Sequence, residues 1–420
     1  MPRDSAVVQH SATLALDERV RARRAAGEDV VHLGFGEAGL PVLAQVTEVL
    51  AGAAGRNEYG AVAGSPQARH AAAGYLTRRG LPTEPADVVL APGSKALLYA
   101  LLAVLPGDLV LPRPSWVSYA AQAALTGKRV LGVPIPQQAG GVPDPALLDD
   151  ALTRARRDGA EPGVLILTLP DNPTGTLADA DLVAQVCAVA DAHRLTVVSD
   201  EIYRDLVHSA SGPRPATVHS PAHHLPERTI VTAGLSKSMA LGGYRIGFAR
   251  IPRPDIRAAV IGVASEVWSS LPAPMQEVAA YVLDEPPEVR DHIAASRRLH
   301  GAVACAMHET FTAAGAHCRP PRAGFYLYPD LEPLRAHGFA TGAELAGHLL
   351  DRHGIGVLAG AAFGDDPSAL RFRVATSLLY GEDTEQRSCA LTSADPVALP
   401  WIRASLARVR DALTAVFQGE

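Results

Sequence analysis

One short loop of this chain, residues 234–247 (GLSKSMALGGYRIG), combines an amine, hydroxyls, glycines and a guanidinium. It follows the apolar run 229–233 and contains Ser236, Lys237 and Arg245. Loops at strand ends are where open α/β sheets bind their ligands. Such a loop could hold a carbonyl cofactor by its phosphate while the lysine forms an imine with it. A surface loop with two solvated cations is the alternative interpretation, so other parts of the chain are needed to choose between them.

Two other apolar runs end in residues that could bind an aromatic phosphate ester. The run 88–91 leads into Gly93, Ser94 and Lys95, a turn into a helix whose backbone N–H groups and hydroxyl could bind a phosphate. An ordinary capped helix would look the same. Trp116 follows the next apolar run, where an indole could stack on a flat ligand or be buried in the core.

Polar residues also follow two buried runs farther along the chain. Asp200 ends the run that begins at Leu195, and an acid there is costly unless it meets a cation or a donor. A pyridinium nitrogen or an arginine could be that partner. Asn172 stands in the turn 171–175 and could donate to a ligand oxygen, although such residues are also common in plain turns.

A guanidinium near the C-terminus is a candidate for binding a carboxylate. Arg371 and Arg373 are two residues apart in the run 370–375, so a strand there would place them on the same side. A planar guanidinium can hold a carboxylate through two hydrogen bonds. A solvated strand face is the alternative.

The elements that must position these residues form an alternating pattern. Short β-branched or leucine-rich runs are separated by stretches with helical spacing, which predicts a mainly parallel sheet covered on both faces. The predicted strands are 88–91, 109–111, 129–133, 164–168, 195–199, 229–232 and 246–249. Helices are predicted at 42–54, from Ser65 onward, and at 178–192, 288–314 and 401–417. The fold class is therefore α/β.

The length of 420 residues exceeds what one core usually supports, so more than one domain is expected. We expect an arm and part of a small domain in residues 1–44, a large domain in 45–285 and a small α+β domain in 286–420. The small domain should contain a strand pair at 324–328 and 370–375. The stretch 381–400, rich in Ser, Thr, Asp and Pro, has the character of an insertion, and two roles stay open for it: reshaping the substrate entrance or only decorating the surface.

The composition limits the classes of partner. Hydrophobic residues make up 48% and charged residues 20%, as in ordinary globular proteins, and the net charge of -6 argues against a nucleic-acid surface. The four cysteines form no C-x-x-C pair, so neither a metal site nor a disulfide framework is expected. No apolar run reaches membrane-spanning length. A cytoplasmic protein without a membrane partner is expected.

Several motifs in the same order resemble the class I/II aminotransferases, the aspartate-aminotransferase-like branch of the fold-type I pyridoxal-phosphate enzymes. They are N-P-T-G at 172–175, D-E-I-Y at 200–203, S-K…G-x-R at 236–245 and R-V-A at 373–375. The similarity covers roughly residues 30 to 378. It implies a large domain with a mainly parallel seven-stranded sheet, a smaller α+β domain, and pyridoxal 5'-phosphate as the cofactor.

The resemblance also implies catalytic roles. Lys237 would form the internal aldimine with the cofactor and later move the proton of the substrate Cα. Asp200 would keep the pyridine nitrogen protonated, so that the ring can accept electrons. Asn172 and Tyr203 would hydrogen-bond to the oxygen on the ring, and Trp116 would stack on the ring.

Further residues would hold the phosphate and the substrate. The phosphate would lie against Gly93, Ser94, Lys95, Ser236 and Arg245. Tyr59 resembles the tyrosine that reaches the phosphate of the neighbouring subunit, which implies a homodimer with shared active sites. Arg373 would hold the substrate α-carboxylate, with the backbone of Gly36 and the side chain of Asn172 nearby.

The expected reaction is transfer of an amino group between an α-amino acid and a 2-oxo acid, in amino acid metabolism or biosynthesis. Other reactions of the same fold stay open: β- or γ-elimination or replacement, or a cyclase or oxidase acting on an amino acid or S-adenosylmethionine. A regulator with a DNA-binding module is not expected, because only about 30 residues precede the matching region.

Two details bear on the subgroup and the substrate. Many family members carry a serine where this chain has Gly234, which we interpret as the mark of one branch. No second arginine is obviously placed to bind a distal carboxylate, so a neutral or aromatic amino acid is preferred. Trp268, Tyr326 and Tyr328 are candidate pocket walls.

Overall fold

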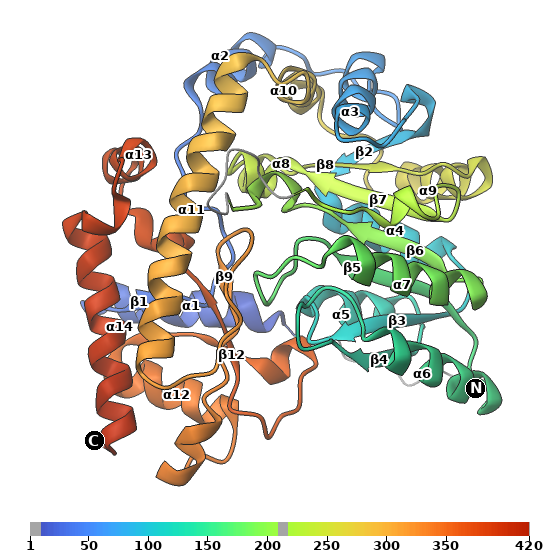
Figure 1. The fold of residues 1–420 in the computed structure, drawn as a ribbon. Coiled ribbons are helices and arrows are strands. Elements are labelled where there is room, and N and C mark those ends of the chain that lie inside the picture. The colour runs from blue at the N-terminus through green and yellow to red at the C-terminus, as the bar shows by residue number, and fades with distance from the viewer. Residues whose placement is uncertain (1–9, 209–216, 420) are drawn as a thin grey trace.

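The computed structural model describes residues 10–208 and 217–419, and all of the predicted site residues lie within these ranges (Figure 1). The first nine residues of the predicted N-terminal arm and the last residue of the chain lie outside them. None of the helices in the described ranges is both long enough and apolar enough to cross a membrane.

A seven-stranded sheet forms the centre of the larger part of the molecule, and the predicted α/β fold is confirmed. Its strands lie in the order β2-β8-β7-β6-β5-β3-β4. Their bounds are β2 (Val88–Pro92), β3 (Asp108–Arg113), β4 (Val130–Pro134), β5 (Pro162–Thr168), β6 (Thr196–Asp200), β7 (Thr229–Gly234) and β8 (Ile246–Arg250). Only β8 runs antiparallel to its neighbours in this sheet, so the other strands all end at the same edge.

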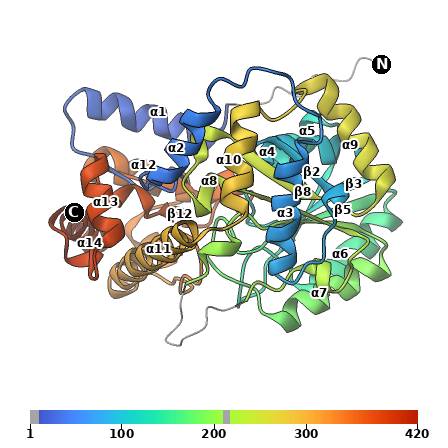
Figure 2. The ribbon, with the colours of Figure 1, turned by 90° about the horizontal axis from the view of Figure 1, so that it is seen from above.

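Helices cover both faces of this sheet, as the uninterrupted apolar runs require (Figures 1 and 2). Alternate residues of one strand point to opposite faces, so Leu165 packs in one core cluster and Ile166 in another. The covering helices are α3 (Pro66–Arg78), α4 (Ser94–Val104), α5 (Val117–Leu125), α6 (Pro145–Arg157), α7 (Ala180–Ala192), α9 (Pro254–Val267) and α10 (Ala273–Leu283). α2 (Ala44–Ala53) packs on α10.

The predicted start of α3 is confirmed by its cap. The side chain of Ser65 accepts a hydrogen bond from the backbone N–H of Ala68 at 3.2 Å, and Pro66 occupies the first helical position. Serine followed by proline strongly indicates a helix start. The serine side chain pairs with one of the free N–H groups of the first turn, and the proline has no N–H that would be left unpaired.

The smaller part of the molecule joins the two ends of the chain (Figure 1). β1 (Val31–His32) pairs with β10 (Ile355–Gly356), and a small antiparallel sheet contains β11 (Leu358–Ala359), β12 (Phe372–Ala375) and β9 (Tyr326–Leu327). The predicted strand pair is therefore present, although both strands are shorter than expected. The helices here are α1 (Ala12–Ala25), α11 (Pro287–Ala313), α12 (Gly342–His353), α13 (Thr384–Thr392) and α14 (Pro400–Gln418).

The unassigned stretch 381–400 contains α13, which packs against α11. Its side-chain cap is conventional: Asp383 accepts from the backbone N–H of Gln386 at 2.8 Å. Ser, Thr and Asp here therefore serve a helix start and surface turns.

Candidate active site

A cavity of about 450 Å³ opens where the carboxyl ends of the large sheet meet the smaller part of the molecule. Eleven of the predicted site residues line it. They are Gly36, Ser94, Lys95, Trp116, Asn172, Asp200, Tyr203, Ser236, Lys237, Arg245 and Arg373. The other two are not in the lining: Gly93 lies against the side chain of Arg245, and Tyr59 is exposed on the surface.

Lys237 reaches the cavity from α8 (Leu235–Ser238), a single turn that directly follows β7. Its Nζ donates a hydrogen bond to the carbonyl oxygen of Gly36 at 2.5 Å. Burial lowers the pKa of this amine to about 8, and the nearby charge of Arg373 acts in the same direction. A substantial fraction of the lysine is therefore neutral and nucleophilic near physiological pH.

Asp200 ends β6 and is buried at the floor of the cavity. The hydroxyl of Tyr119 donates to its Oδ2 at 2.8 Å and lies 3.0 Å from Oγ1 of Thr168. Oδ1 of Asp200 has no hydrogen-bond partner among the described residues, and burial raises the pKa of this carboxyl to about 6. A buried carboxylate oxygen without a donor is costly, so this oxygen is suited to accept a proton-bearing ligand atom.

Arg245 and Lys95 give one end of the cavity positive charge. The pairing of β2 with β8 places Pro92 opposite Ile246, and so brings the start of α4 beside Arg245. Burial and the charge of Arg245 lower the pKa of Lys95. The N-terminus of α4, beginning at the buried Ser94, points free N–H groups toward the same end. This arrangement favours an anion such as a phosphate.

Gly93 makes the approach of Arg245 possible. A Cβ at this position would lie 2.3 Å from Nη2 of Arg245, and the φ angle of +85° is one that glycine adopts most readily. Arg245 itself has a left-handed backbone (φ 54°) and donates from Nη1 to the carbonyl oxygen of Gly242 at 2.9 Å.

Arg373 projects from β12 and is only 1% exposed. It donates from Nη1 to Oδ1 of Asn172 at 3.1 Å and from Nη2 to the carbonyl oxygen of Gly34 at 2.8 Å. Its guanidinium carbon lies 4.7 Å from the ring centre of Tyr326 and 4.9 Å from that of Phe363. Burial lowers its pKa, and it pairs with no carboxylate of the described residues. A carboxylate ligand would supply the missing charge.

Arg371, predicted on the same strand side, lies outside this cavity. It pairs with Asp330 at 2.8 Å and with Asp365 at 3.0 Å. Two arginines of similar sequence context thus differ in their surroundings, because only Arg371 has its neutralising carboxylates already in place.

Aromatic side chains complete the walls. The hydroxyl groups of Tyr203 and Tyr326 lie 2.8 Å apart, and Trp116 lies edge-on to Tyr119 with ring centres 5.2 Å apart. Of the three aromatic walls considered from the sequence, only Tyr326 lines the cavity. Tyr328 instead donates to Asp365 at 2.9 Å, and Trp268 packs in the core beside α9.

Some lining residues were missed by sequence reasoning. Tyr119, the partner of Asp200, lies three residues after Trp116 and therefore on the same face of its helix, a spacing that was a usable signal. Ser11, Thr13 and Leu14 line the cavity from the start of α1, and no local pattern indicates this.

The structure leaves little room for a side chain at Gly234. A Cβ there would lie 2.8 Å from the backbone carbonyl oxygen of Ile246, on the neighbouring strand. A serine would require the β7–β8 pair to move apart, so in this chain the glycine fits the close spacing of the two strands.

Comparisons with known proteins agree with the fold. The family model of aminotransferase class I and II matches residues 28–378. The chain is 32% identical over 399 residues to the aspartate/prephenate aminotransferase of Cereibacter sphaeroides, covering 91% of this chain and 95% of that one. It is 31% identical to the aspartate aminotransferase of Geobacillus stearothermophilus, covering 88% and 92%.

Among solved structures, the aspartate aminotransferase from Thermus thermophilus with maleate matches with a TM-score of 0.82 and 26% identity, covering 96% of this chain and 97% of that one. The names of these relatives favour transamination over the elimination, cyclase and oxidase alternatives. The chain therefore belongs to the class I and II aminotransferases and is a pyridoxal-phosphate-dependent transaminase.

Proposed function

We propose that amino-group transfer takes place in this cavity, with Lys237 as the amine that carries the cofactor and Arg373 as the group that binds the substrate carboxylate. One observation carries the proposal: three groups line the same cavity. They are Lys237 with its lowered pKa, the unpaired Oδ1 of Asp200, and the buried Arg373, which pairs with no carboxylate of the described residues. Each of the three is costly alone and is satisfied by a different part of the cofactor-substrate pair.

The residues present fit pyridoxal 5'-phosphate. When bound, this cofactor supplies an aldehyde that bonds to an amine and a ring that accepts electrons. The unpaired Oδ1 of Asp200 is suited to accept a hydrogen bond from the ring nitrogen, and a proton held there keeps the carboxylate charged despite its burial. Trp116 would cover one face of the ring.

The amide of Asn172 is already oriented for its proposed role. Because Arg373 donates to Oδ1, the amide presents Nδ2 as a donor to any other group in the cavity. That donor and the hydroxyl of Tyr203 would bind the ring oxygen of the cofactor. The phosphate would be held by Ser94, Ser236, Lys95 and Arg245, with Gly93 providing the space that Arg245 needs.

Lys237 would then move the proton of the substrate Cα. Its lowered pKa allows it to accept a proton and return it near neutral pH. Arg373 and Gly36 would fix the carboxylate end of the substrate, and so determine which bond at Cα faces Lys237.

We further propose a homodimer with shared active sites, working in the cytoplasm. Tyr59 is 93% exposed, a setting in which a partner subunit would bury it and place its hydroxyl at a phosphate. All four cysteines are free, which suits a reducing compartment. We also propose the division into residues 1–44 with 286–420 and residues 45–285, because Val31 and Leu33 share a core with α14.

For the side chain of the substrate we propose a neutral or aromatic amino acid. The cations that line the cavity are Lys95, Lys237, Arg245 and Arg373, and each has a role toward the cofactor or the α-carboxylate. Leu14, Phe35 and Val117 line the same space. The names of the relatives support a second candidate, aspartate with a prephenate-type oxo acid as the acceptor.

The test mixes holoenzyme with one amino acid at a time and follows the cofactor absorbance until it reaches the amino form. Fastest conversion by phenylalanine, tyrosine or leucine is expected, whereas fastest conversion by aspartate or glutamate would support the second candidate. Borohydride reduction followed by peptide mapping should place the cofactor on Lys237. Fixation on Lys95, or unchanged fixation in Lys237→Ala, would overturn the assigned role.

A further inference from the structure

A second cavity, of about 370 Å³, shares no lining residue with the active site and is lined by arginines from three elements. Its charged lining residues are Arg78, Arg79, Arg204, Asp205, Glu285, Arg290 and Arg297. They come from the end of α3, from the 3-10 helix η2 (Arg204–Leu206) and from α11 with the turn before it. Nothing in the transamination chemistry uses them.

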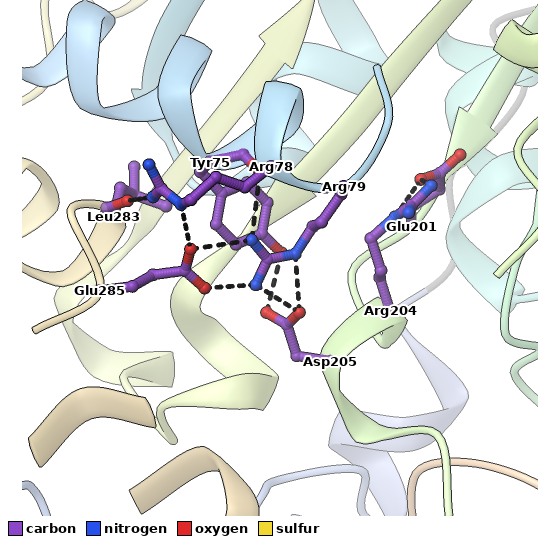
Figure 3. Close-up of polar contacts among 8 residues, drawn as sticks. All are labelled: Tyr75, Arg78, Arg79, Glu201, Arg204, Asp205, Leu283 and Glu285. Atoms are coloured by element: carbon purple, nitrogen blue, oxygen red, sulfur yellow. Dashed lines mark hydrogen bonds and ion pairs between the residues drawn. The ribbon is translucent and has the colours of Figure 1, made fainter. Parts of the chain in front are cut away.

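Part of this cluster is a closed ionic network, drawn in Figure 3. Arg79 donates to Asp205 at 2.7 Å and to Glu285 at 2.5 Å, and Arg78 donates to the same Glu285 at 2.7 Å. Burial alone would raise the pKa of Glu285, but the hydrogen bonds from the two arginines outweigh it and lower the pKa. Both carboxylates of the cavity are thus already engaged by α3 arginines.

Arg204 is neutralised separately. Its Nε donates to Oε2 of Glu201 at 2.6 Å, a contact that Figure 3 shows to one side of the network. Counting Glu201, five arginines face three carboxylates, so two arginines are left without an ion pair among the described residues. One of them, Arg290, lies near enough to Glu288 to help lower the pKa of that carboxyl.

The two arginines without an ion pair belong to α11. Arg290, Ile293, Ala294 and Arg297 are spaced as one helical face, and this face lines the cavity. Arg290 donates only to the backbone carbonyl oxygen of Glu285, which does not neutralise it. Arg297 has no hydrogen bond or ion pair within the described parts of the chain, and its Nε is buried without a partner. Arg290 is exposed and Arg297 is half-buried, but leaving the buried Nε donor of Arg297 unpaired is unfavourable, so the observation points to a missing anion.

From these contacts we infer that this cavity is a binding site for a small anion that carries at least two negative charges on phosphate groups. Arg290 and Arg297 are seven residues apart, so their α-carbons are separated by about 10 Å along the helix, within reach of two long side chains on one ligand. Guanidinium groups approach from α11 and from the end of α3, where Arg78 donates to described residues only through Nε and Nη2 and keeps Nη1 available. Tetrahedral phosphate oxygens point in several directions and suit donors from several sides, whereas a planar carboxylate suits a single fork.

The second cavity is separate from the first, although one segment borders both. Asp200 and Tyr203 line the active site, whereas Arg204 and Asp205 line the second cavity. In holoenzyme the phosphate-binding end of the active site is filled by the cofactor. Binding of an added phosphate compound to holoenzyme therefore measures the second cavity.

The test is calorimetric titration of holoenzyme with inorganic pyrophosphate, with no activity measurement involved. We expect saturable binding that weakens as salt is added, and that is weaker by about tenfold or more in the double variant Arg290→Gln/Arg297→Gln. The matched control is Arg298→Gln, an exposed neighbour on the same helix that does not line the cavity. It should bind pyrophosphate as the wild type does.

Three results would overturn the inference: no saturable binding by wild-type holoenzyme, equal binding by the double variant, or an equal loss in Arg298→Gln. Succinate binding that is tighter than pyrophosphate binding and is weakened in the double variant would overturn the assignment to phosphate, because succinate held by Arg373 in the active site is unaffected by that variant. Because glutamine keeps a polar side chain at both positions, the double variant should fold, and unchanged circular dichroism confirms that it has. If it does not fold, the single variant Arg297→Gln, whose wild-type side chain has no partner to lose, decides the question.

Discussion

Nη1 of Arg373 donates a hydrogen bond to Oδ1 of Asn172 over 3.1 Å, and this contact links the proposed carboxylate site to the proposed cofactor site. The two residues are 201 positions apart and come from different parts of the molecule. A change in how Arg373 is held therefore reaches the amide that would touch the cofactor.

Replacing Arg373 by lysine should weaken substrate binding. A lysine keeps the charge but cannot hold a carboxylate with two parallel hydrogen bonds. We expect KM for the amino donor to rise by about tenfold to a hundredfold, with a smaller change in kcat. Steady-state kinetics measure this, with Arg371→Lys as the control, since Arg371 is already paired outside the cavity. An equal rise in KM in both variants would contradict the proposed role.

The lowered pKa of Lys237 predicts how cofactor loading depends on pH. Only the neutral amine attacks an aldehyde, so the loading rate of apoprotein should rise with pH and level off above about 8 rather than near the usual lysine value. Stopped-flow absorbance after mixing apoprotein with pyridoxal phosphate measures it. A rate that keeps rising to about pH 10 would show an ordinary lysine.

Replacing Asp200 by asparagine should have opposite effects on apoprotein and holoenzyme. The pKa of Asp200 is raised to about 6, so the folded apoprotein loses stability as pH rises from about 4 to 6 and the buried carboxyl ionises. Asp200→Asn removes that loss, and its apoprotein should unfold at a temperature higher than that of the wild type at pH 7 by about 2 °C.

In holoenzyme the same substitution would remove the charge that we propose lies opposite the ring nitrogen. We expect kcat to fall by about a hundredfold or more. Calorimetric unfolding of both forms and kinetics of the loaded enzyme together measure this. An apoprotein that is less stable than the wild type at pH 7 would argue that Asp200 is satisfied without the cofactor.

Gly93→Ala should weaken cofactor binding through Arg245. The new Cβ would displace the guanidinium, so we expect the Kd for pyridoxal phosphate to rise by about tenfold. Gly159→Ala is a matched control, because Gly159 has a similar φ of +81° but open space around it. Both variants should lose about 1 kcal/mol of stability from the backbone, and only Gly93→Ala should lose cofactor affinity.

Much of the large sheet could be predicted because its strands are short apolar runs buried on both faces, a pattern that needs no knowledge of distant residues. The reversed direction of β8 could not, because strand direction depends on the path of the chain between strands. That reversal is what places Arg245, at the start of β8, beside the ends of the parallel strands.

Within the cavity, residues on strand ends were predictable and residues brought in by packing were not. Asp200 and Asn172 follow apolar runs, so their place at the sheet edge follows from the sequence. Leu14 reaches the same cavity from α1, across a separation in sequence that leaves no local trace. The place of the α11 arginines in the second cavity was likewise not predictable. In the sequence, a helix with Arg290 and Arg297 looks like any solvated helix until the elements packed around it are known.

The tripeptide Gly34-Phe35-Gly36 holds two cations at once, since the carbonyl oxygen of Gly34 accepts from Arg373 and that of Gly36 accepts from Lys237. In the protein without ligand, these neutral oxygens accept hydrogen bonds that the two cations could otherwise donate to a ligand. In the proposed role of Arg373, an incoming substrate enters by exchange, with an ionic group replacing a backbone dipole on the guanidinium. Uncharged analogues, such as amino acid amides, would gain little from that exchange, so we expect the protein to reject them at the entry step rather than during the chemistry.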